Sequence, residues 1–378
     1  MSEPDVFVVA DNIFSPLGTT TVENFTALKQ GLSGVKEHHD TCISPLPFFA
    51  SLFDKDEVFV SDEKNIHTKF EHLLIASIAD ALQQSGIDPK DKKNILIISS
   101  TKGNISLLET EAYNFRLKGR ISLSHSADLI AAHFGFVNQP VIISNACISG
   151  VLAIITGMRL LSSGQYENAV IAGADVISKF IFSGFESFQA LSRQICKPFD
   201  KSRDGLNLGE GAATVVLSAN KKYRGNIKVK AGAVSNDANH ISGPSRTGKE
   251  LAYAINKSID DSRVSAVDIG FISAHGTATI FNDEMEANAI AIAGLQNVPV
   301  NSLKGYYGHT LGAAGLVEFV VSIQSLKQGL VLPTAGFQHL DKNMNINVCA
   351  SALPTKATNF IKTASGFGGC NAAIVVGE

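Results

Sequence analysis

Apolar and polar positions alternate along the chain in a pattern that predicts strands and helices in turn. Short apolar runs typical of buried strands lie at 94–99, 141–144, 169–174, 213–218, 270–274, 298–302 and 372–377. Helix-length patterns, such as 148–163 and 313–327, lie between these runs. Because crossover helices cover the sheet whose strands they connect, the pattern predicts an α/β fold with helix-covered sheets.

The two halves of the chain resemble each other in three places. Segment 139–165 resembles 298–329, segment 81–103 resembles 258–279, and segment 208–218 resembles 366–376. In the first pair, Gly150 falls on Gly315 and Gly164 on Gly329. Three similarities in the same order favour a duplication over chance. We therefore predict two similar βα halves, residues 1–219 and 220–378, with the polar run 218–226 as linker and the functional elements at their junction.

Composition excludes several classes of protein. The 378 residues carry 32 Lys and Arg against 35 Asp and Glu, a net charge of −3, which excludes nucleic-acid binding driven by bulk charge. The hydrophobic fraction of 45% excludes a disordered chain. Charged residues make up only 18%, against about 25% in ordinary globular domains. We expect an apolar oligomer interface to account for part of this difference.

The cysteines, the N-terminal residues and the lengths of the apolar runs indicate in which cellular compartment to expect the protein. Five cysteines without a CxxC spacing exclude a disulfide scaffold and a cysteine metal site, and they indicate a reducing environment. The acidic N-terminus lacks the basic region of a signal peptide. Charges such as Arg159 and Glu318 interrupt the apolar stretches before they reach the ~18 residues of a membrane span. We expect a soluble, cytoplasmic protein that does not enter a membrane.

Cys147 is the first candidate for chemistry. It follows a buried strand and an Asn-Ala turn, and it opens a helix. The free backbone N–H groups and dipole of a helix N-terminus lower the pKa of a thiol, and the small neighbours Ala146, Ser149 and Gly150 leave room for a substrate. The alternative is a buried, inert cysteine, the commoner fate of a lone one.

Two histidines occupy comparable turns. His275 ends the strand at 270–274, and His309 precedes the helix from about 313; glycines flank both. Either histidine alone could be structural. The duplication places Cys147 and His309 at equivalent turns of the two halves, so all three side chains converge at the junction, as acyl transfer at a thioester requires. The GFGG turn at 366–369 could supply oxyanion-hole N–H groups, and His240 is a weaker candidate for substrate contact.

Six motifs together carry a family resemblance over nearly the whole chain. They are NACISG (145–150), KPFDKSRDGLNLGEGAA (197–213), DANHISGP (237–244), HGTATIFNDEME (275–286), NSLKGYYGHTLGAAG (301–315) and SGFGGCNA (365–372). In this order they resemble the β-ketoacyl-acyl-carrier-protein synthases, which are condensing enzymes. The resemblance implies a thiolase-like fold of two pseudo-duplicated βα halves in an α-β-α-β-α layering.

The resemblance also implies a reaction and its principal residues. Cys147 would hold the acyl chain as a thioester for decarboxylative Claisen condensation with a malonyl-carrier protein, in fatty acid or polyketide and polyene biosynthesis. His275 and His309 would assist decarboxylation and stabilise the enolate oxygen. Lys304 matches the active-site lysine of the family. Neutral imidazoles suit this role because they donate N–H groups to a developing oxyanion.

Further roles follow from the same motifs. Asp283 and Glu286 match acidic positions that support the hydrogen bonding of the site. The N–H groups of Cys147 and Phe367 would form the oxyanion hole, with Phe367 as a movable gate. The hydroxyl groups of Thr277 and Thr279 would bind the phosphopantetheine arm.

The resemblance implies partners rather than cofactors. No metal or redox cofactor is expected, because the phosphopantetheine arrives on the acyl carrier protein. The chain would form a homodimer, or a heterodimer with a related chain-length-factor-like subunit, through the sheet of its first half. We expect the surplus apolar surface mostly on that half, around the strand before Cys147, and a local basic patch for the acidic carrier protein.

Some features depart from the family pattern, and two alternatives stay open. Ala278 and Asn282 stand where the family has glycine, and the loop at 192–196 is short. The acyl chain, the primer and the pathway are therefore open. One alternative is a thiolase acting on CoA thioesters, with Cys370 as its second cysteine. The other is a non-catalytic chain-length-factor-like partner.

Overall fold

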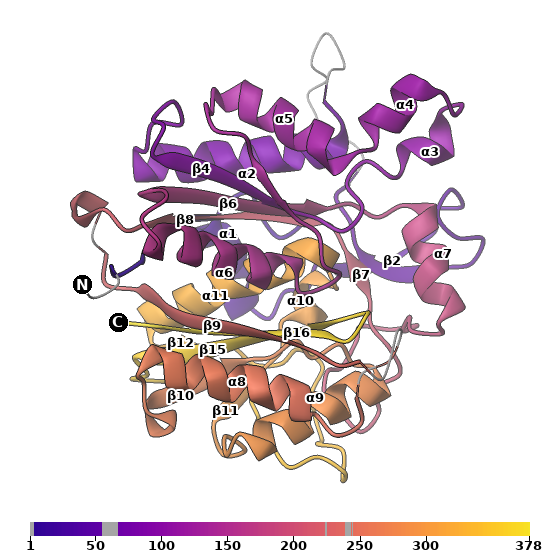
Figure 1. Ribbon diagram of the computed structural model, residues 1–378. Coiled ribbons are helices and arrows are strands. Elements are labelled where there is room, and N and C mark those ends of the chain that lie inside the picture. The colour runs from indigo at the N-terminus through magenta and orange to yellow at the C-terminus, as the bar shows by residue number, and fades with distance from the viewer. Residues whose placement is uncertain (1–3, 55–66, 224, 239–242, 244) are drawn as a thin grey trace.

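The computed structural model describes residues 4–54, 67–223, 225–238, 243 and 245–378. Among these residues, the main sheet has 11 strands in the order β13-β11-β10-β15-β16-β9-β1-β8-β6-β4-β5 (Figure 1). Its first-half strands are β1 (Phe7–Phe14), β4 (Asn94–Ser99), β5 (Val141–Ile143), β6 (Asn168–Asp175) and β8 (Gly211–Ser218). Its second-half strands are β9 (Lys228–Asn236), β10 (Ile269–Ser273), β11 (Pro299–Asn301), β13 (Asn347–Val348), β15 (Asn359–Gly366) and β16 (Cys370–Gly377).

The helices and the smaller strands complete the described chain. The first-half helices are α1 (Thr21–Lys29), α2 (Lys69–Ser85), α3 (Leu107–Thr110), α4 (Phe115–Arg120), α5 (Leu123–Phe134), α6 (Ser149–Ser162) and α7 (Lys179–Ser187). The second-half helices are α8 (Lys249–Ser262), α9 (Ile280–Ile292), α10 (Lys304–Tyr307) and α11 (Ala314–Gln328). Short 3-10 turns are η1 (Lys221–Tyr223), η2 (Ala266–Asp268) and η3 (Leu311–Ala313). The small sheets contain β2 (Val35–His38), β3 (Phe48–Ser51) and β7 (Leu208–Gly209), and β12 (Leu330–Val331) and β14 (Leu353–Pro354).

The two halves repeat one strand order. The first half runs β5-β4-β6-β8-β1 across the sheet, and the second runs β11-β10-β15-β16-β9. In each half the first two pairings are parallel and the last two are antiparallel. The halves join where β1 meets β9, at Phe7 and Lys228. The predicted fold of two similar halves is confirmed, and the predicted boundary at 219/220 falls between β8 and β9.

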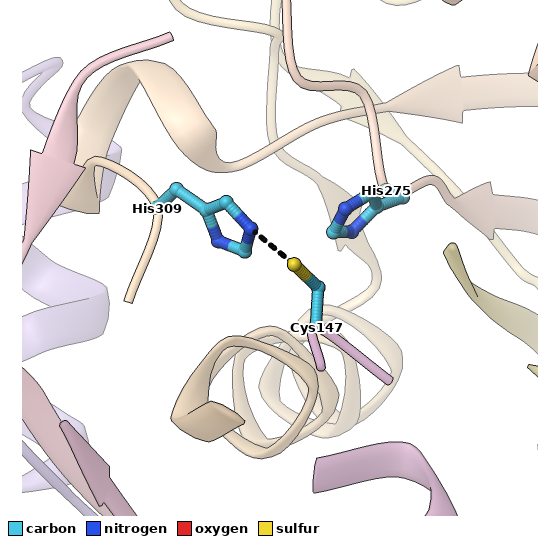
Figure 2. Close-up of side chains that lie close together, drawn as sticks. All are labelled: Cys147, His275 and His309. Carbon is cyan, nitrogen blue, oxygen red and sulfur yellow. Dashed lines mark hydrogen bonds between the residues drawn. The ribbon is translucent and has the colours of Figure 1, made fainter. Parts of the chain in front are cut away.

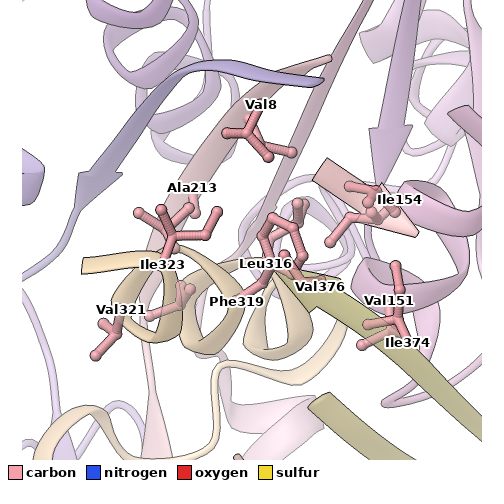
Figure 3. Close-up of a cluster of buried hydrophobic side chains, with 14 of the residues drawn as sticks. Val8, Val151, Ile154, Ala213, Leu316, Phe319, Val321, Ile323, Ile374 and Val376 are labelled. Carbon is pink, nitrogen blue, oxygen red and sulfur yellow. The ribbon is translucent and has the colours of Figure 1, made fainter. Parts of the chain in front are cut away.

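Helices separate and cover the two halves of the sheet. Figure 1 shows α6 and α11 between them, with α2 and α5 over the first half and α8 and α9 over the second. Strands β4, β6 and β8 are fully buried because helices cover both faces, which explains their unbroken apolar runs. Figure 3 shows part of the central cluster, including Val151 and Ile154 of α6, Leu316 and Phe319 of α11, and Ile374 of β16.

Exposed apolar side chains are spread over both halves of the described chain. Strand β5 forms one edge of the main sheet, and its residues are only partly buried. Exposed large apolar side chains nevertheless occur in both halves, from Tyr113 and Phe115 to Tyr253, Ile280 and Phe281. The expectation that the surplus lies mostly on the first half stays a prediction, because the exposed apolar side chains lie on both halves and include Ile280 and Phe281 of α9. Within the described ranges, every helix is too short or too polar to cross a bilayer.

Candidate functional site

The nucleophile candidate stands on a strained turn between β5 and α6. Ala146 adopts a φ of 44°, in the left-handed region that side chains usually avoid. The Ser149 hydroxyl accepts a hydrogen bond from the Asn145 N–H and donates one to the Ala146 carbonyl, which closes the turn. Cys147 is thereby held at the start of α6, with only 8% of its surface exposed.

The sulfur of Cys147 and both imidazoles converge (Figure 2). His309 Nε2 lies 3.0 Å from Cys147 Sγ. The rings of His275 and His309 meet edge to face with their centroids 5.2 Å apart. One donor atom of each of the three side chains lies within 4.8 Å of the other two, a spacing that would also suit a soft metal ion. Turns far apart in sequence thus build one site, as the duplication predicts.

Burial dominates the ionisation of Cys147. It raises the pKa of the thiol to about 12, against the smaller lowering effects of the Lys304 charge and of the Phe367 backbone N–H. The expectation of a lowered pKa is therefore wrong for the free protein, because the loss of water outweighs the helix N-terminus. The thiol has its proton acceptor in His309, at hydrogen-bond distance.

Both histidines are held neutral. Burial lowers the pKa of His275 and of His309 well below the ordinary value, and the positive charge of Lys304 lowers both further. A neutral imidazole offers one N–H donor and one acceptor nitrogen. The pair can therefore accept the thiol proton at one ring and donate to a substrate oxygen at another.

Buried charges fix the turn that carries His275. Glu286 accepts hydrogen bonds from the backbone N–H groups of His275 (2.8 Å) and Gly276 (2.7 Å). Asp283 accepts from the Thr277 N–H at 2.9 Å, and burial raises its pKa to about 7. Lys304 Nζ donates to the His275 carbonyl at 3.0 Å. These side chains support the turn, as the family motifs imply.

A cavity of about 800 Å³ opens above the three side chains. Thr277 and Thr279 line it, and their hydroxyl oxygens lie 2.8 Å apart. Phe367 also lines it and is 41% exposed, with its ring stacked on Phe185 at a centroid distance of 5.8 Å and tilted against Phe188 at 5.4 Å. The Phe367 ring thus contacts two aromatic rings at the cavity wall, and its role as a movable gate stays a prediction.

The departures from the family pattern lie beside this cavity. Ala278 has a φ of 60°, a conformation that costs an alanine about 1–2 kcal/mol and a glycine little. Asn282 lines the cavity and donates to Asp283 at 3.3 Å. Gln189 and Ala190, which precede the short loop, line it too. His240 lies outside the described residues.

Comparison with known families decides the identity of the chain. Residues 3–222 match the family model for the β-ketoacyl synthase N-terminal domain, and residues 227–338 match that for the C-terminal domain. The chain belongs to the β-ketoacyl synthase family. The predicted family and the predicted enzyme class, an acyltransferase that forms β-ketoacyl chains, are thereby confirmed.

Relatives of this β-ketoacyl synthase cover its whole length. It is 30% identical to 3-oxoacyl-[acyl-carrier-protein] synthase 2 of Vibrio cholerae over 411 aligned residues, which cover 99% of each chain. It is similar in fold to the ishigamide ketosynthase/chain length factor, with a TM-score of 0.90, 24% identity and coverage of 100% and 99%. The ketosynthase ApeO in complex with its chain length factor ApeC, from Xenorhabdus doucetiae, gives a TM-score of 0.85 at 24% identity, with coverage of 99% and 98%.

Several residues of the synthase site escaped the sequence analysis. Glu318 pairs with Lys304 beneath His275, although in the sequence it only interrupts an apolar run. Buried Asp175, at the end of β6, accepts from the Gly312 N–H at 2.7 Å, in the turn that follows His309. Lys362 of β15 is fully buried behind His275. A charged residue inside an apolar helix or strand pattern was the available signal.

Proposed function

We propose that the chain condenses an acyl group, held as a thioester on Cys147, with malonyl-acyl-carrier protein. The observation that carries this proposal is one buried thiol within 3.0 Å of His309, with the neutral imidazole of His275 beside it, at the floor of the cavity. A nucleophile, a base and a second N–H donor are the groups that acyl transfer followed by enolate stabilisation needs.

Acyl transfer comes first. His309 Nε2 takes the thiol proton, and Sγ attacks the thioester carbonyl of the acyl-carrier protein. We assign stabilisation of the negative charge on the carbonyl oxygen to the N–H groups of Cys147 and Phe367; in the free protein the Phe367 N–H lowers the pKa of the Cys147 thiol. The phosphopantetheine thiolate leaves and takes up the proton, and the acyl group remains on Cys147.

Decarboxylative condensation follows. The thioester oxygen of the malonyl group accepts N–H donation from His275 and His309, so loss of CO₂ leaves an enolate that the two rings stabilise. The enolate carbon attacks the carbonyl carbon of the Cys147 thioester, and Sγ leaves as a thiolate that takes a proton from solvent. Loss of one such oxyanion donor typically costs a factor of 10² to 10³ in rate.

The proposed partners follow from the reaction and from the names of related proteins. The acyl carrier protein brings its own phosphopantetheine, so the proposed chemistry needs no metal or redox cofactor. A related solved structure is a type II polyketide acyl-carrier protein in complex with its ketosynthase, and another pairs a ketosynthase with a chain length factor. We infer an acyl carrier protein and a second subunit, either a copy or a chain-length-factor-like relative, for this chain. The cytoplasm remains the predicted compartment, and fatty acid or polyketide synthesis the predicted pathway.

The two alternatives are less well supported. A thiolase would use Cys370 near the nucleophile as a base, but the Cys370 thiol instead lies 3.3 Å from the Phe367 carbonyl, which it can reach as a donor. A non-catalytic partner would not need a thiol and two neutral histidines in contact at the floor of a cavity.

The proposal predicts that the chain, given one carrier protein loaded with an acyl group and another loaded with malonyl, releases one CO₂ for each β-ketoacyl product. Trapped ¹⁴CO₂ from labelled malonyl-carrier protein and mass analysis of the product would measure both. His275→Ala should lower CO₂ release at least 10²-fold while acylation of Cys147 persists. Cleavage of acetoacetyl-CoA without CO₂ chemistry would instead establish a thiolase, and inertness in both assays a non-catalytic partner.

A further inference from the structure

Two buried ammonium groups hold the strand end that carries His275. Lys362 Nζ donates to the carbonyls of Ser273 and Ala274, both at 3.2 Å, and to that of Thr363 at 2.7 Å. Lys304 Nζ donates to the carbonyl of His275 at 3.0 Å. Three successive carbonyls, 273 to 275, thus point toward lysine side chains. This arrangement holds the backbone that carries His275, and Lys304 Nζ also lies 3.5 Å from Nδ1 of its ring.

The same two lysines share one carboxylate. Lys304 pairs with Glu318 Oε1, and Lys362 Nζ lies 2.6 Å from Glu318 Oε2 at an angle outside hydrogen-bond geometry, so the second contact is an ion pair. Glu286 of α9 is the other carboxylate near Lys362, and it accepts the Thr363 hydroxyl at 2.6 Å. With Lys362 charged, two cations from α10 and β15 balance two carboxylates from α9 and α11 behind the imidazoles.

Packing alone does not account for a lysine on this strand. Its neighbour Ile361 is apolar and buried, and an unbranched apolar side chain would fill the Lys362 position without burying a charge. Taking an ammonium group out of water costs several kcal/mol even after pairing. Burial accordingly lowers the pKa of Lys362. Such a cost beside a reactive site favours a functional role over a structural one.

We propose that Lys362 is a positioning residue for the condensation: its buried charge holds the His275 turn and balances Glu318 and Glu286, so that both imidazoles stay neutral through acyl transfer and condensation. This inference rests on the proposed function. Without Lys362, Lys304 alone would face two carboxylates, and the site would carry a net negative charge. A negative charge favours imidazolium, which lacks the lone pair that accepts the Cys147 proton.

The charge of Lys362 affects the pKa values of both histidines in the same direction. The charge of Lys362 lowers the pKa of His275 and of His309, after burial and Lys304. Removal of that charge therefore raises both pKa values, and protonation begins at a higher pH. Burial and Lys304 lower both pKa values more than Lys362 does. The acid limb of the rate profile should move to higher pH when the charge of Lys362 is removed.

The test compares Lys362→Met with Lys230→Met over pH 5.5–8.5. Lys230 is a partly buried lysine on β9 that donates to Asn359 at 2.7 Å, so it controls for the loss of an internal lysine. For Lys362→Met we expect the acid limb of kcat for CO₂ release to move to higher pH, with the loss of rate largest at pH 5.5 and KM for malonyl-carrier protein little changed. Lys362→Arg should retain the wild-type limb, and Lys230→Met should not move it.

An unmoved limb, or a rate loss equal at every pH, would overturn the proposal. If Lys362→Met does not fold by circular dichroism, Lys362→Gln takes its place, because an amide can still donate to the carbonyls without the charge. Acylation of Cys147 is measured on every variant at pH 8.5, where the histidines are neutral in all of them, so that a misfolded site is recognised. Wild-type protein without CO₂ release would refute the proposed function; active wild type with a normal Lys362 variant refutes only this inference.

Discussion

At Cys147, burial favours the protonated thiol, whereas catalysis needs the thiolate. Burial raises its pKa to about 12, so in the free protein the sulfur is protonated and unreactive toward solvent oxidants that need a thiolate. His309 Nε2 at 3.0 Å provides the acceptor that frees the sulfur when a thioester enters. The arrangement favours reaction with a bound substrate over reaction with small molecules from solution.

The buried histidines predict how stability depends on pH. Their pKa values are lowered in the folded state, so folding is favoured above the unfolded value near 6.5 and this contribution is lost as the pH falls below it. Each histidine should cost about 1.4 kcal/mol of unfolding free energy per pH unit below that value. Between pH 7.5 and 5.5, the double variant with His275→Asn and His309→Asn should lose about 2–3 kcal/mol less than the wild type.

Urea unfolding at both pH values measures this difference. The total pH dependence of stability is not diagnostic of the histidines, because burial also raises the pKa of Asp283 to about 7. The contribution of Asp283 is opposite to that of the histidines, since it stabilises the fold as the pH falls. Only the difference between variant and wild type isolates the histidines. Equal losses in the two proteins would mean that the rings take up protons freely in the folded state.

The sequence predicted the reactive residues better than the residues around them. Cys147 and His309 could be predicted to lie close together because they occupy equivalent turns of a duplicated unit. His275 could be identified from the sequence motif that it begins. Glu318 and Lys362 could not be found in this way. Each stands inside an apolar helix or strand, and only the packing of α11 and β15 against the His275 turn gives its charge a partner.

At the scale of elements, the site depends on how closely α6 and α11 approach. Gly150 and Gly315 face each other where these helices cross. A Cβ on Gly150 would lie 2.8 Å from the Leu316 nitrogen, and one on Gly315 would lie 2.7 Å from the Val151 nitrogen. The two helices begin just after Cys147 and His309, so their separation sets the distance between sulfur and ring.

Gly150→Ala should therefore destabilise the protein by about 1–3 kcal/mol, because backbone atoms must move to admit the methyl group. Gly184→Ala in α7 is the matched control: open space surrounds that position, and alanine should stabilise the helix by about 0.5–1 kcal/mol. Chemical unfolding of both variants would measure the changes. A Gly150→Ala protein as stable as the control would mean that the helices are not in close contact.

The elements that could be predicted were those with a regular pattern. The run at 94–99 is strand β4, and the helices expected at 148–163 and 313–327 are α6 at Ser149–Ser162 and α11 at Ala314–Gln328. Helix α7, which contains Phe185, and Phe188 directly after it carried no such signal. They matter because they pack against Phe367 at the cavity wall, a contact that depends on the tertiary fold.

At the scale of the whole molecule, β5 is the exposed edge of the sheet and leads directly to Cys147. An unpaired edge strand offers hydrogen-bond donors and acceptors to another chain. The low fraction of charged residues, 18%, is consistent with a covered apolar surface, although the exposed apolar side chains lie on both halves. A second subunit on β5 would place two nucleophile turns close to one interface.

We expect the active protein to contain a second subunit paired on β5. Light scattering should give about twice the 40.1 kDa of the chain, and the β5 amides should exchange slowly with deuterium, as those of a covered strand do. If the partner is a relative rather than a copy, the same protection should appear only in the heterodimer. An active monomer whose β5 amides exchange freely would contradict this expectation.

The account as a whole depends on an acyl group that passes through Cys147. Intact-mass analysis tests this most directly, after incubation with carrier proteins that bear acyl groups of several lengths. The wild type is compared with Cys147→Ala and with Cys370→Ala, a variant of the neighbouring cysteine. The wild type and Cys370→Ala should each gain the mass of one acyl group, and Cys147→Ala, folded by circular dichroism, should gain none. Acylation of Cys147→Ala, or its absence from the wild type with every acyl-carrier protein, would contradict the account.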